Sequence, residues 1–300
     1  MVSSFVITGY LGSGKTTLIL NSVREHLKHK NIAVIVNEFG EVGLDGRILK
    51  NVYSQVLEIE EGCICCKLSQ EFEKAVMEII SLYSPEVIIV ESSGTSEPFP
   101  IVFSLRTVGT AVEGVVCVVD SKNFFRYEKE DTARYQIASA NMIVLNKTDL
   151  VDEEHLGRVE ERVRNIKDTY RIENMFSEEK RRNLYRIYRA SGGRVPLEVF
   201  EGTGDPLTLL QRHPDHSHGE MGQKVLEIKE DITYKEFKTF MESLPENIYR
   251  AKGIVKLKDF PEPLFVHYVF GDLDIGMPAG NYEGKPFLVL IGKSSSKDPP

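Results

Sequence analysis

The octapeptide GYLGSGKT, residues 9–16, lies between an apolar run and a stretch of helical periodicity. The run Phe5–Thr8 predicts a strand, and Thr16–Lys28 predicts the helix that follows it. This arrangement satisfies the pattern G-x-x-x-x-G-K-[S/T] in the strand–loop–helix context that the pattern requires. The glycines let successive backbone N–H groups point at phosphate oxygens, and the start of the helix adds partial positive charge. The octapeptide therefore predicts a phosphate-binding loop rather than a chance glycine-rich turn.

Short β-branched runs alternate with amphipathic stretches through the first two thirds of the chain. Several runs are apolar at nearly every residue, which is typical of strands covered on both faces. The further predicted strands are Ile32–Val36, Val56–Ile59, Val87–Val90, Val115–Val119, Met142–Leu145 and Val195–Phe200. The further predicted helices are Gln70–Tyr83, Asp131–Ser139, Glu153–Ile166 and Ser177–Tyr188. The alternation predicts the α/β fold of a P-loop NTPase, with a doubly wound, mainly parallel sheet.

The alternating pattern stops near residue 205, where polar sequence with Pro and Gly begins. We expect a P-loop domain over residues 1–210, a His-containing linker over 211–223, a smaller α+β domain over 224–293 and a disordered tail over 294–300. The elements predicted for the small domain are strands Val225–Ile228, Ile254–Leu257, Leu264–Phe270 and Phe287–Ile291 and helix Tyr234–Leu244.

The composition narrows the classes of partner. The chain has 300 residues, and 45 acidic against 37 basic side chains leave a net charge of −8, which argues against a generally basic nucleic-acid binder. No apolar run approaches the ~20 residues that span a bilayer. The first residues lack the basic leader of a signal peptide. We therefore expect a cytoplasmic protein without nucleic-acid or membrane partners; a homodimer is one oligomeric state compatible with the sequence.

Two candidate catalytic residues accompany the phosphate loop. Lys15 is expected to reach the β- and γ-phosphates, and the Thr16 hydroxyl is expected to bind Mg²⁺. Glu91 follows the buried run Val87–Val90, so it either faces the ligand crevice on the Mg²⁺ side or caps the strand at the surface. Gly94 is expected to offer its N–H to the γ-phosphate. The residues of the loop expected to contact nucleotide are Gly9, Gly12, Ser13, Gly14, Lys15, Thr16 and Thr17.

The sequence NKTD, residues 146–149, comes directly after the predicted strand Met142–Leu145. A carboxylate at Asp149 can accept hydrogen bonds from the N1–H and N2–H₂ groups of guanine. Adenine presents no such pair of donors, so an unpaired carboxylate penalises it. Lys147 can lie along the base, and Asn146 can tie this loop to the phosphate loop. These residues predict GTP rather than ATP as the nucleotide.

Three of the four cysteines lie within four residues, at Cys63, Cys65 and Cys66. Two or three thiolates suit soft or borderline metal ions, with Zn²⁺ the leading candidate and Cu(I) compatible with the ligand type. The fourth ligand is open between Glu41, a His, water and a target protein. A redox thiol cluster and a set of unliganded structural cysteines are competing interpretations. Cys117 stands alone in an apolar run and is expected in the core.

Three further segments carry charge or metal-binding side chains. The loop Asn37–Asp45 is expected near the γ-phosphate, where Glu38 or Asp45 can contact Mg²⁺, although a plain solvated loop also fits its composition. The expected helix over 177–188 and its continuation place Arg182, Arg186 and Arg189 on one face, which is either solvated or faces an acidic partner. The linker histidines form either a solvated segment or a metal store, and they are His213, His216 and His218.

In combination these features resemble the CobW-like GTPases, P-loop metallochaperones related to the nickel-insertion GTPases of urease and hydrogenase. The residues that carry the resemblance are Gly9–Thr16, Asn37–Asp45, Gly62–Cys66, Glu91–Gly94, Glu97–Pro98, Asp120 and Asn146–Asp149. In the small domain, Arg250–Val255 and Leu288–Lys293 resemble strands of the family. The resemblance implies Mg²⁺·GTP binding, slow GTP hydrolysis, and Zn²⁺ or Co²⁺ held at the cysteines for delivery to a client metalloprotein.

The leading hypothesis is a switch in which GTP and Mg²⁺ order the Asn37–Asp45 loop and thereby tighten metal binding at the cysteines, while hydrolysis loosens it. A P-loop small-molecule kinase is a competing hypothesis, but it predicts ATP use, against which Asn146–Asp149 argues. A non-enzymatic metal buffer and a thiol redox switch are two further hypotheses that the sequence leaves open.

Overall fold

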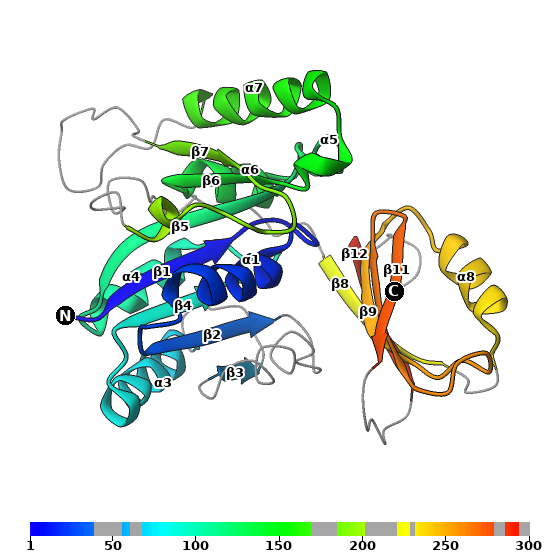
Figure 1. Cartoon of the computed structure of the whole chain (residues 1–300), viewed down its shortest axis with the longest axis horizontal. Helices are drawn as coiled ribbons and strands as arrows, with labels where there is room; N and C mark the ends of the chain where they lie inside the picture. Colours follow the sequence, from blue (N-terminus) through cyan, green and yellow to red (C-terminus); the bar gives the residue numbers. More distant parts are fainter. Residues whose placement is uncertain are drawn as a thin grey trace. The chain divides into compact units, whose positions relative to one another are not determined.

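The computed structural model describes residues 1–38, 56–60, 68–169, 185–201, 221–228, 232–278 and 286–293. The chain divides into two compact units, Met1–His213 and Pro214–Pro300 (Figure 1).

A parallel sheet forms the centre of the first unit. In its described part seven strands pair in the order β3-β2-β4-β1-β5-β6-β7, and each of these pairings is parallel. The strands are β1 (Ser3–Thr8), β2 (Ile32–Glu38), β3 (Val56–Glu60), β4 (Val87–Glu91), β5 (Ala111–Asp120), β6 (Met142–Asn146) and β7 (Arg186–Arg189). Because all strands run the same way, their carboxyl ends meet at one edge, where ligands of open α/β sheets bind.

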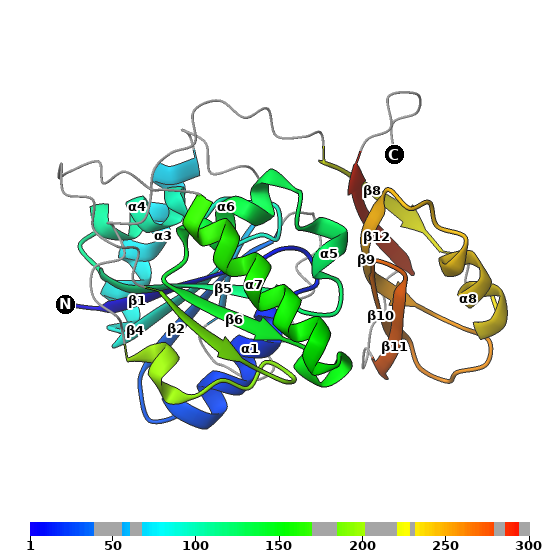
Figure 2. The same cartoon turned by 90° about the horizontal axis from the view of Figure 1, so that it is seen from above.

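Helices cover both faces of this sheet, as Figure 2 shows for α1 on one side and α3, α4 and α6 on the other. Their bounds are α1 (Lys15–Ser22, continued by a π-helical turn, Val23–Leu27), α3 (Leu68–Tyr83), α4 (Phe99–Thr107), α5 (Phe124–Tyr127), α6 (Asp131–Ser139) and α7 (Glu153–Thr169). On the α1 side, Leu18 and Ile19 pack in one buried cluster with Phe5 and Ile7 of β1. The predicted doubly wound α/β fold is confirmed.

The predicted strand Val195–Phe200 is wrong, because Leu197–Phe200 forms a 3₁₀ turn that buries Val199 and Phe200. The Phe200 ring packs edge-on against Phe5, with centroids 5.3 Å apart. The turn thus helps to cover the sheet face on which α1 lies. A short apolar run satisfies such a covering turn as well as a strand, so periodicity alone does not separate the two.

The predicted helix Ser177–Tyr188 is wrong at its end, since Arg186–Arg189 is strand β7, paired with β6. The predicted helical face therefore does not exist for Arg186 and Arg189; Arg182 lies outside the described residues. On a strand, positions three apart point to opposite faces. The Arg189 guanidinium is paired within the chain, with Glu153 at 2.9 Å and Glu160 at 3.3 Å.

The second unit contains an antiparallel sheet with strand order β11-β10-β9-β12-β8 and one described helix. The elements are β8 (Met221–Glu227), α8 (Tyr234–Glu242), β9 (Ile248–Val255), β10 (Leu264–Val269), β11 (Asp272–Pro278) and β12 (Phe287–Lys293). Helix α8 starts with a capping box between Thr233 and Glu236, and it packs Phe237 and Met241 into the core of this unit. The expected smaller α+β fold is confirmed.

Sequence patterns did not predict α4, α5 or β11, and they placed the start of β9 six residues late, at Ile254 instead of Ile248. The reason for β9 is that Arg250 and Lys252 interrupt the apolar pattern, although both are buried in the structure.

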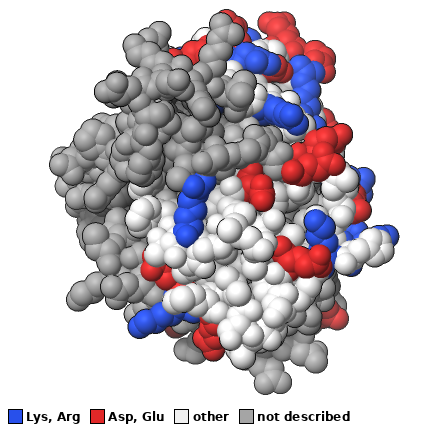
Figure 3. Space-filling view, turned by 90° about the vertical axis from the view of Figure 1, so that its left-hand side faces the viewer, with Lys and Arg blue, Asp and Glu red and all other residues white. Residues whose placement is uncertain are grey.

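Helices in the described part of the chain are all too short or too polar to cross a membrane. On the face drawn in Figure 3, Lys and Arg side chains are interspersed with Asp and Glu side chains around uncharged ones. The acidic side chains drawn on this face are scattered among basic and uncharged ones and form no single patch.

Candidate functional site

The phosphate loop connects β1 to α1 and uses glycine where no side chain fits. Gly9, Gly12 and Gly14 have φ values of +139°, +71° and +98°, which L side chains rarely adopt. A Cβ on Gly9 would lie 2.2 Å from the Val118 carbonyl oxygen of β5. The loop is thereby curled tightly against the carboxyl end of the sheet, as a phosphate cradle requires.

Lys15 begins α1, and its side chain is buried within the loop. Its Nζ donates to the Gly9 carbonyl oxygen at 2.8 Å. The cation therefore already lies on the inner side of the loop, where phosphate oxygens can replace the carbonyl as its partners. Of the other predicted loop residues, Ser13 is buried and Thr17 is exposed at the start of α1.

Thr16 and Glu91 meet at the edge of the sheet. The Thr16 hydroxyl donates to Glu91 Oε1 at 2.9 Å, and Glu91 is only 4% exposed at the end of β4. Strand β4 pairs with β1, with Glu91 opposite Ile7, so the carboxylate emerges beside the phosphate loop. Hydroxyl and carboxylate oxygens are ligands that Mg²⁺ prefers, so this pair fits the ion. Glu91 is thus placed in the crevice and not as a surface cap.

Gly94 lies in the turn after Glu91 and touches the phosphate loop. A Cβ on Gly94 would approach Leu11 Cδ2 to 2.6 Å and the Leu11 backbone nitrogen to 3.0 Å. Gln136 of α6 holds the same turn, because its Nε2 donates to the Ser96 carbonyl at 2.8 Å and to the Gly94 carbonyl at 3.3 Å. No local pattern indicates this role for Gln136, which is fully buried in the middle of a helix.

Asn146 ties three loops together. Its Nδ2 donates to the Ser13 carbonyl at 2.9 Å, and its Oδ1 accepts from the Gly193 N–H at 2.9 Å. A Cβ on Gly193 would lie 2.7 Å from the Leu18 nitrogen, so the loop around residue 193 abuts α1. The expected link between Asn146 and the phosphate loop is present, whereas Gly193 was missed because it is 47 residues away along the chain.

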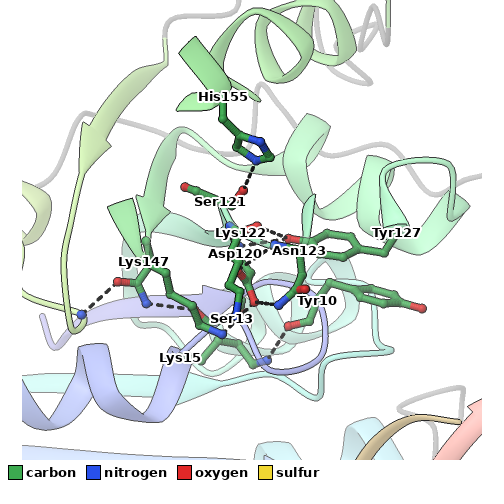
Figure 4. A network of polar contacts seen from close by, with 12 residues as sticks. Tyr10, Ser13, Lys15, Asp120, Ser121, Lys122, Asn123, Tyr127, Lys147 and His155 are labelled. Carbon is green, nitrogen blue, oxygen red and sulfur yellow. Dashed lines mark hydrogen bonds and ion pairs between the residues drawn. The ribbon is translucent and has the colours of Figure 1, made fainter. Parts of the chain in front are cut away.

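The remaining residues of the NKTD segment line the same edge. Lys147 has a φ of +61°, and its Nζ lies 2.7 Å from Asp120 Oδ2 (Figure 4). Asp149 is exposed, so its carboxylate is accessible to an incoming base. The Thr148 hydroxyl donates to the Ala190 carbonyl at 3.0 Å, which joins this segment to the loop after β7.

The predicted metal ligands Cys63, Cys65, Cys66 and Glu41 lie outside the described residues, as do Asp45 and the linker histidines. Where the chain enters their segments is described: β2 ends at Glu38 and β3 at Glu60, directly opposite each other in a parallel pair. Glu41 and Cys63 each follow three residues later. Within the described residues, no group of three or more His, Cys, Asp and Glu side chains gathers as a metal site.

The sheet topology and the phosphate loop together define a P-loop protein that binds a nucleoside triphosphate. Residues 3–174 match the family described as "CobW/HypB/UreG, nucleotide-binding domain", and residues 221–299 match "Cobalamin synthesis protein cobW C-terminal domain". The chain belongs to the CobW/HypB/UreG family, which confirms the resemblance seen in the sequence.

Curated relatives extend over most of the chain. A protein named zinc chaperone CobW from Pseudomonas aeruginosa is 32% identical over 312 residues, covering 88% of this chain and 79% of its own length. A protein of the same name from Sinorhizobium sp. is 30% identical over 327 residues, covering 97% and 84%. Among solved structures, Zn(II)-bound YjiA GTPase from E. coli aligns with 98% of this chain and 95% of its own, at 20% identity and a TM-score of 0.45.

Proposed function

We propose that this chain is a GTP-hydrolysing metallochaperone that binds a transition metal and delivers it to a client protein under nucleotide control. The observation that carries the nucleotide half is the convergence of Lys15, the Thr16–Glu91 pair and the Asn146–Asp149 segment at one edge of the sheet. The metal half is supported by the relatives named zinc chaperones and by the chemistry of the cysteine segment.

The hydrolysis is a phosphoryl transfer to water that depends on positioning and on neutralising charge. Lys15 exchanges the Gly9 carbonyl for β- and γ-phosphate oxygens, and the Gly94 N–H contacts the γ-phosphate. Thr16 and Glu91 are the residues that would hold Mg²⁺, and the ion would supply positive charge at the phosphate oxygens. We expect the intrinsic turnover to be slow and the client to accelerate it.

GTP selectivity rests on Asp149, whose exposed carboxylate accepts the paired donors of guanine. Displacement of a fluorescent guanine nucleotide tests this directly: unlabelled ATP should require a concentration on the order of 100-fold higher than GTP. Asp149→Asn should abolish most of that preference. Equal displacement by ATP and GTP from the unaltered chain would favour the small-molecule kinase.

The metal cargo is proposed to be Zn²⁺ or Co²⁺, held by Cys63, Cys65 and Cys66 with Glu41 as a candidate fourth ligand. The entry points of the two segments support this, because Glu38 and Glu60 lie opposite each other on neighbouring strands. Strand β4, which ends at Glu91, pairs with β2 on its other side. Thiolates that follow β3 would therefore start two strands away from the Mg²⁺ side of the nucleotide.

The experiment that tests nucleotide control is anaerobic competition for Zn²⁺ against a chromophoric chelator, with either a non-hydrolysable GTP analogue or GDP present. Tighter binding with the analogue is expected in the unaltered chain. Lys15→Ala should bind metal with no difference between the two nucleotides, and Cys65→Ser should bind metal weakly with both. Identical Zn²⁺ affinities with the GTP analogue and with GDP in the unaltered chain would favour a metal buffer that nucleotide does not control.

The client is proposed to be a metalloprotein that receives the ion by ligand exchange, in the cytoplasm. Transfer from the Zn²⁺-loaded chain to an apo-client should therefore quicken during GTP hydrolysis and not with the GTP analogue. Transfer at one rate under both conditions would contradict this proposal.

A further inference from the structure

We propose that Asp120 is a positioning residue for guanine recognition: its buried carboxylate holds the Lys147 ammonium and so keeps the NKTD segment in the conformation that accepts the base. The inference rests on the proposed GTP specificity and assigns a task to a carboxylate that contacts neither the expected phosphates nor the expected base donors.

Asp120 is the last residue of β5 and is fully buried. Its Oδ1 accepts hydrogen bonds from the backbone N–H groups of Lys122 at 3.0 Å and Asn123 at 3.1 Å. Its Oδ2 accepts from Asn123 Nδ2 at 3.0 Å and from Lys147 Nζ at 2.7 Å (Figure 4). The turn after β5 therefore fixes the carboxylate and leaves one oxygen directed at Lys147.

Lys147 needs such a partner because its backbone is unusual. A φ of +61° places a long L side chain in the left-handed region, and that conformation persists only where the surroundings enforce it. A buried carboxylate with a single orientation is a strong constraint on an ammonium, because a charge-assisted bond gains strength away from water. With its ammonium held, the Lys147 side chain has a fixed position, two residues before Asp149 in the segment expected to receive the base.

The same end of β5 is linked to the phosphate loop. Asp120 lies opposite Asn146 in the parallel pair β5–β6, and the Ser121 N–H donates to the Asn146 carbonyl at 3.0 Å. The Tyr127 hydroxyl accepts from the Asp120 N–H at 3.0 Å, and its ring stacks on Tyr10 of the phosphate loop with centroids 4.8 Å apart. Burial, with the nearby Asp120 charge, raises the pKa of Tyr127 and keeps the phenol neutral.

Asp120→Asn is the sharpest perturbation, because it keeps the shape and removes the charge. One side of the new amide would present N–H donors to Lys147 and Asn123, which are themselves donors. Lys147 would then lose its orientation, and binding would have to order it. We expect GTP and GDP affinity to fall about three- to tenfold, with KM raised and kcat unchanged, since the interaction is made equally in ground and transition states.

A double-mutant cycle on GDP affinity separates positioning from general stability. Asp120→Asn and Lys147→Met should each weaken GDP, and the double variant should bind no more weakly than Lys147→Met alone, because Asp120 acts through Lys147. Glu128→Gln is the matched control: it neutralises a nearby acid that pairs with Arg162, outside this set of contacts, and should leave GDP affinity unchanged. Multiplying losses in the double variant, or unaltered GDP affinity in Asp120→Asn, would overturn the proposal.

If Asp120→Asn does not fold, Lys147→Gln replaces it in the comparison. A Gln amide can still donate to Asp120, so Lys147→Gln should bind GDP more tightly than Lys147→Met, and equal affinities would count against Asp120. The proposed GTP specificity is tested by a separate measurement, the ratio of GDP to ADP affinity in the unaltered chain. Because no variant is used in that measurement, its failure can be told apart from failure of the Asp120 proposal.

Discussion

Single residues of the nucleotide site are set by close approaches that leave no room for a side chain. A Cβ on Gly14 would lie 2.5 Å from Asn146 Nδ2, and one on Gly94 would lie 2.6 Å from Leu11 Cδ2. Distances this short force a neighbour to move. At Gly94 the neighbours include the backbone of Leu11 in the phosphate loop, so a side chain there would push the turn that carries Gly94 away from the loop.

Gly94→Ala should lower kcat for GTP hydrolysis by about 10- to 100-fold, because small displacements of a group near the reacting phosphate are costly. GDP affinity should change by less than about threefold, since GDP lacks the γ-phosphate that Gly94 is proposed to contact. Gly157→Ala is the control: Gly157 lies in α7 with open space around its Cα, and its substitution should leave kcat unaltered. Steady-state GTP hydrolysis and GDP titration test this prediction. An equal loss of kcat in Gly94→Ala and Gly157→Ala would contradict the proposed contact between Gly94 and the γ-phosphate.

Cys117 illustrates a residue whose environment removes its reactivity. It is 1% exposed in β5, and burial raises the pKa of its thiol to about 12. The expectation of a core cysteine is therefore confirmed. At pH 8 iodoacetamide should leave Cys117 unmodified in the folded chain and modify it in guanidinium chloride, because only the thiolate attacks. Peptide mass mapping reads the outcome, and rapid native labelling of Cys117 would refute it.

At the scale of elements, α6 supports both the turn that carries Gly94, the proposed γ-phosphate contact, and the core. Gln136 in its middle holds the turn that carries Gly94, and its carboxyl end is held by α7. There the buried Lys167 ammonium donates to the Ala138 and Ala140 carbonyls, each at 2.6 Å. Carbonyls at the end of a helix lack the partner that the next turn would supply, so Lys167 serves as the cap.

Gln136→Leu should lower kcat about fivefold or more with little effect on GDP affinity, because the turn would lose its support on the γ-phosphate side. Unfolding free energy should fall by roughly 1–3 kcal/mol, since two carbonyl oxygens lose a buried donor. Gln136→Glu separates the hydrogen bonds of Gln136 from its packing, because a carboxylate removes the N–H donors but keeps the size of the side chain. Urea unfolding and hydrolysis rates together test this, and unaltered kcat in a folded Gln136→Leu chain would show that the turn needs no such support.

Burial lowers the pKa of Lys167 to about 7, well below its ordinary value of 10.5. Between pH 7 and 10.5 the unfolded chain therefore binds more protons at this position than the folded chain does. Unfolding free energy should rise with pH across that window and level off below it. Lys167→Met removes the group, so the difference in urea midpoint should grow in favour of the unaltered chain from about pH 7 to about pH 9.5. If the urea midpoints of the unaltered chain and of Lys167→Met change in parallel with pH, the pKa of Lys167 does not contribute to the pH dependence of stability.

For the whole molecule, the proposed function depends on coupling between a nucleotide and a metal ion. Strands β1, β4 and β2 are neighbours in one parallel sheet, so their carboxyl ends lie side by side. The phosphate loop, Glu91 and the segment after Glu38 therefore start at one edge. This arrangement allows a ligand at one position to bias a segment that begins at the next. Coupling of this kind is reciprocal by thermodynamic necessity.

If a GTP analogue tightens Zn²⁺ binding tenfold over GDP, about 1.4 kcal/mol, then Zn²⁺ must raise the preference for the analogue over GDP by the same factor. Calorimetric titration of each ligand with and without the other measures both factors. Cys65→Ser should reduce both together, whereas the Glu128→Gln chain should keep them. If the two measured factors differ in the unaltered chain, then Zn²⁺ and nucleotide binding are not related by one closed thermodynamic cycle.

Local sequence determined the chemistry of the nucleotide site and the class of fold. The spacing of Gly9–Thr16, the acid after a buried strand at Glu91 and the segment Asn146–Asp149 were each predicted, and they lie at one edge of the sheet. These features are readable because each is confined to a few consecutive residues, where backbone geometry and spacing are encoded directly. The same holds for the strands β1, β2, β4 and β6, whose unbroken apolar runs require burial on both faces.

The tertiary structure alone decided how those pieces are held. Gln136 reaches Gly94 across 42 residues, and Gly193 reaches Asn146 across 47. The contact of Asp120 with Lys147 spans 27 residues. No periodicity relates such positions, because they become neighbours only when the sheet assembles. For the same reason Arg186–Arg189 became a strand instead of the end of the predicted helix: the edge of β6 that pairs with it exists only in the assembled sheet.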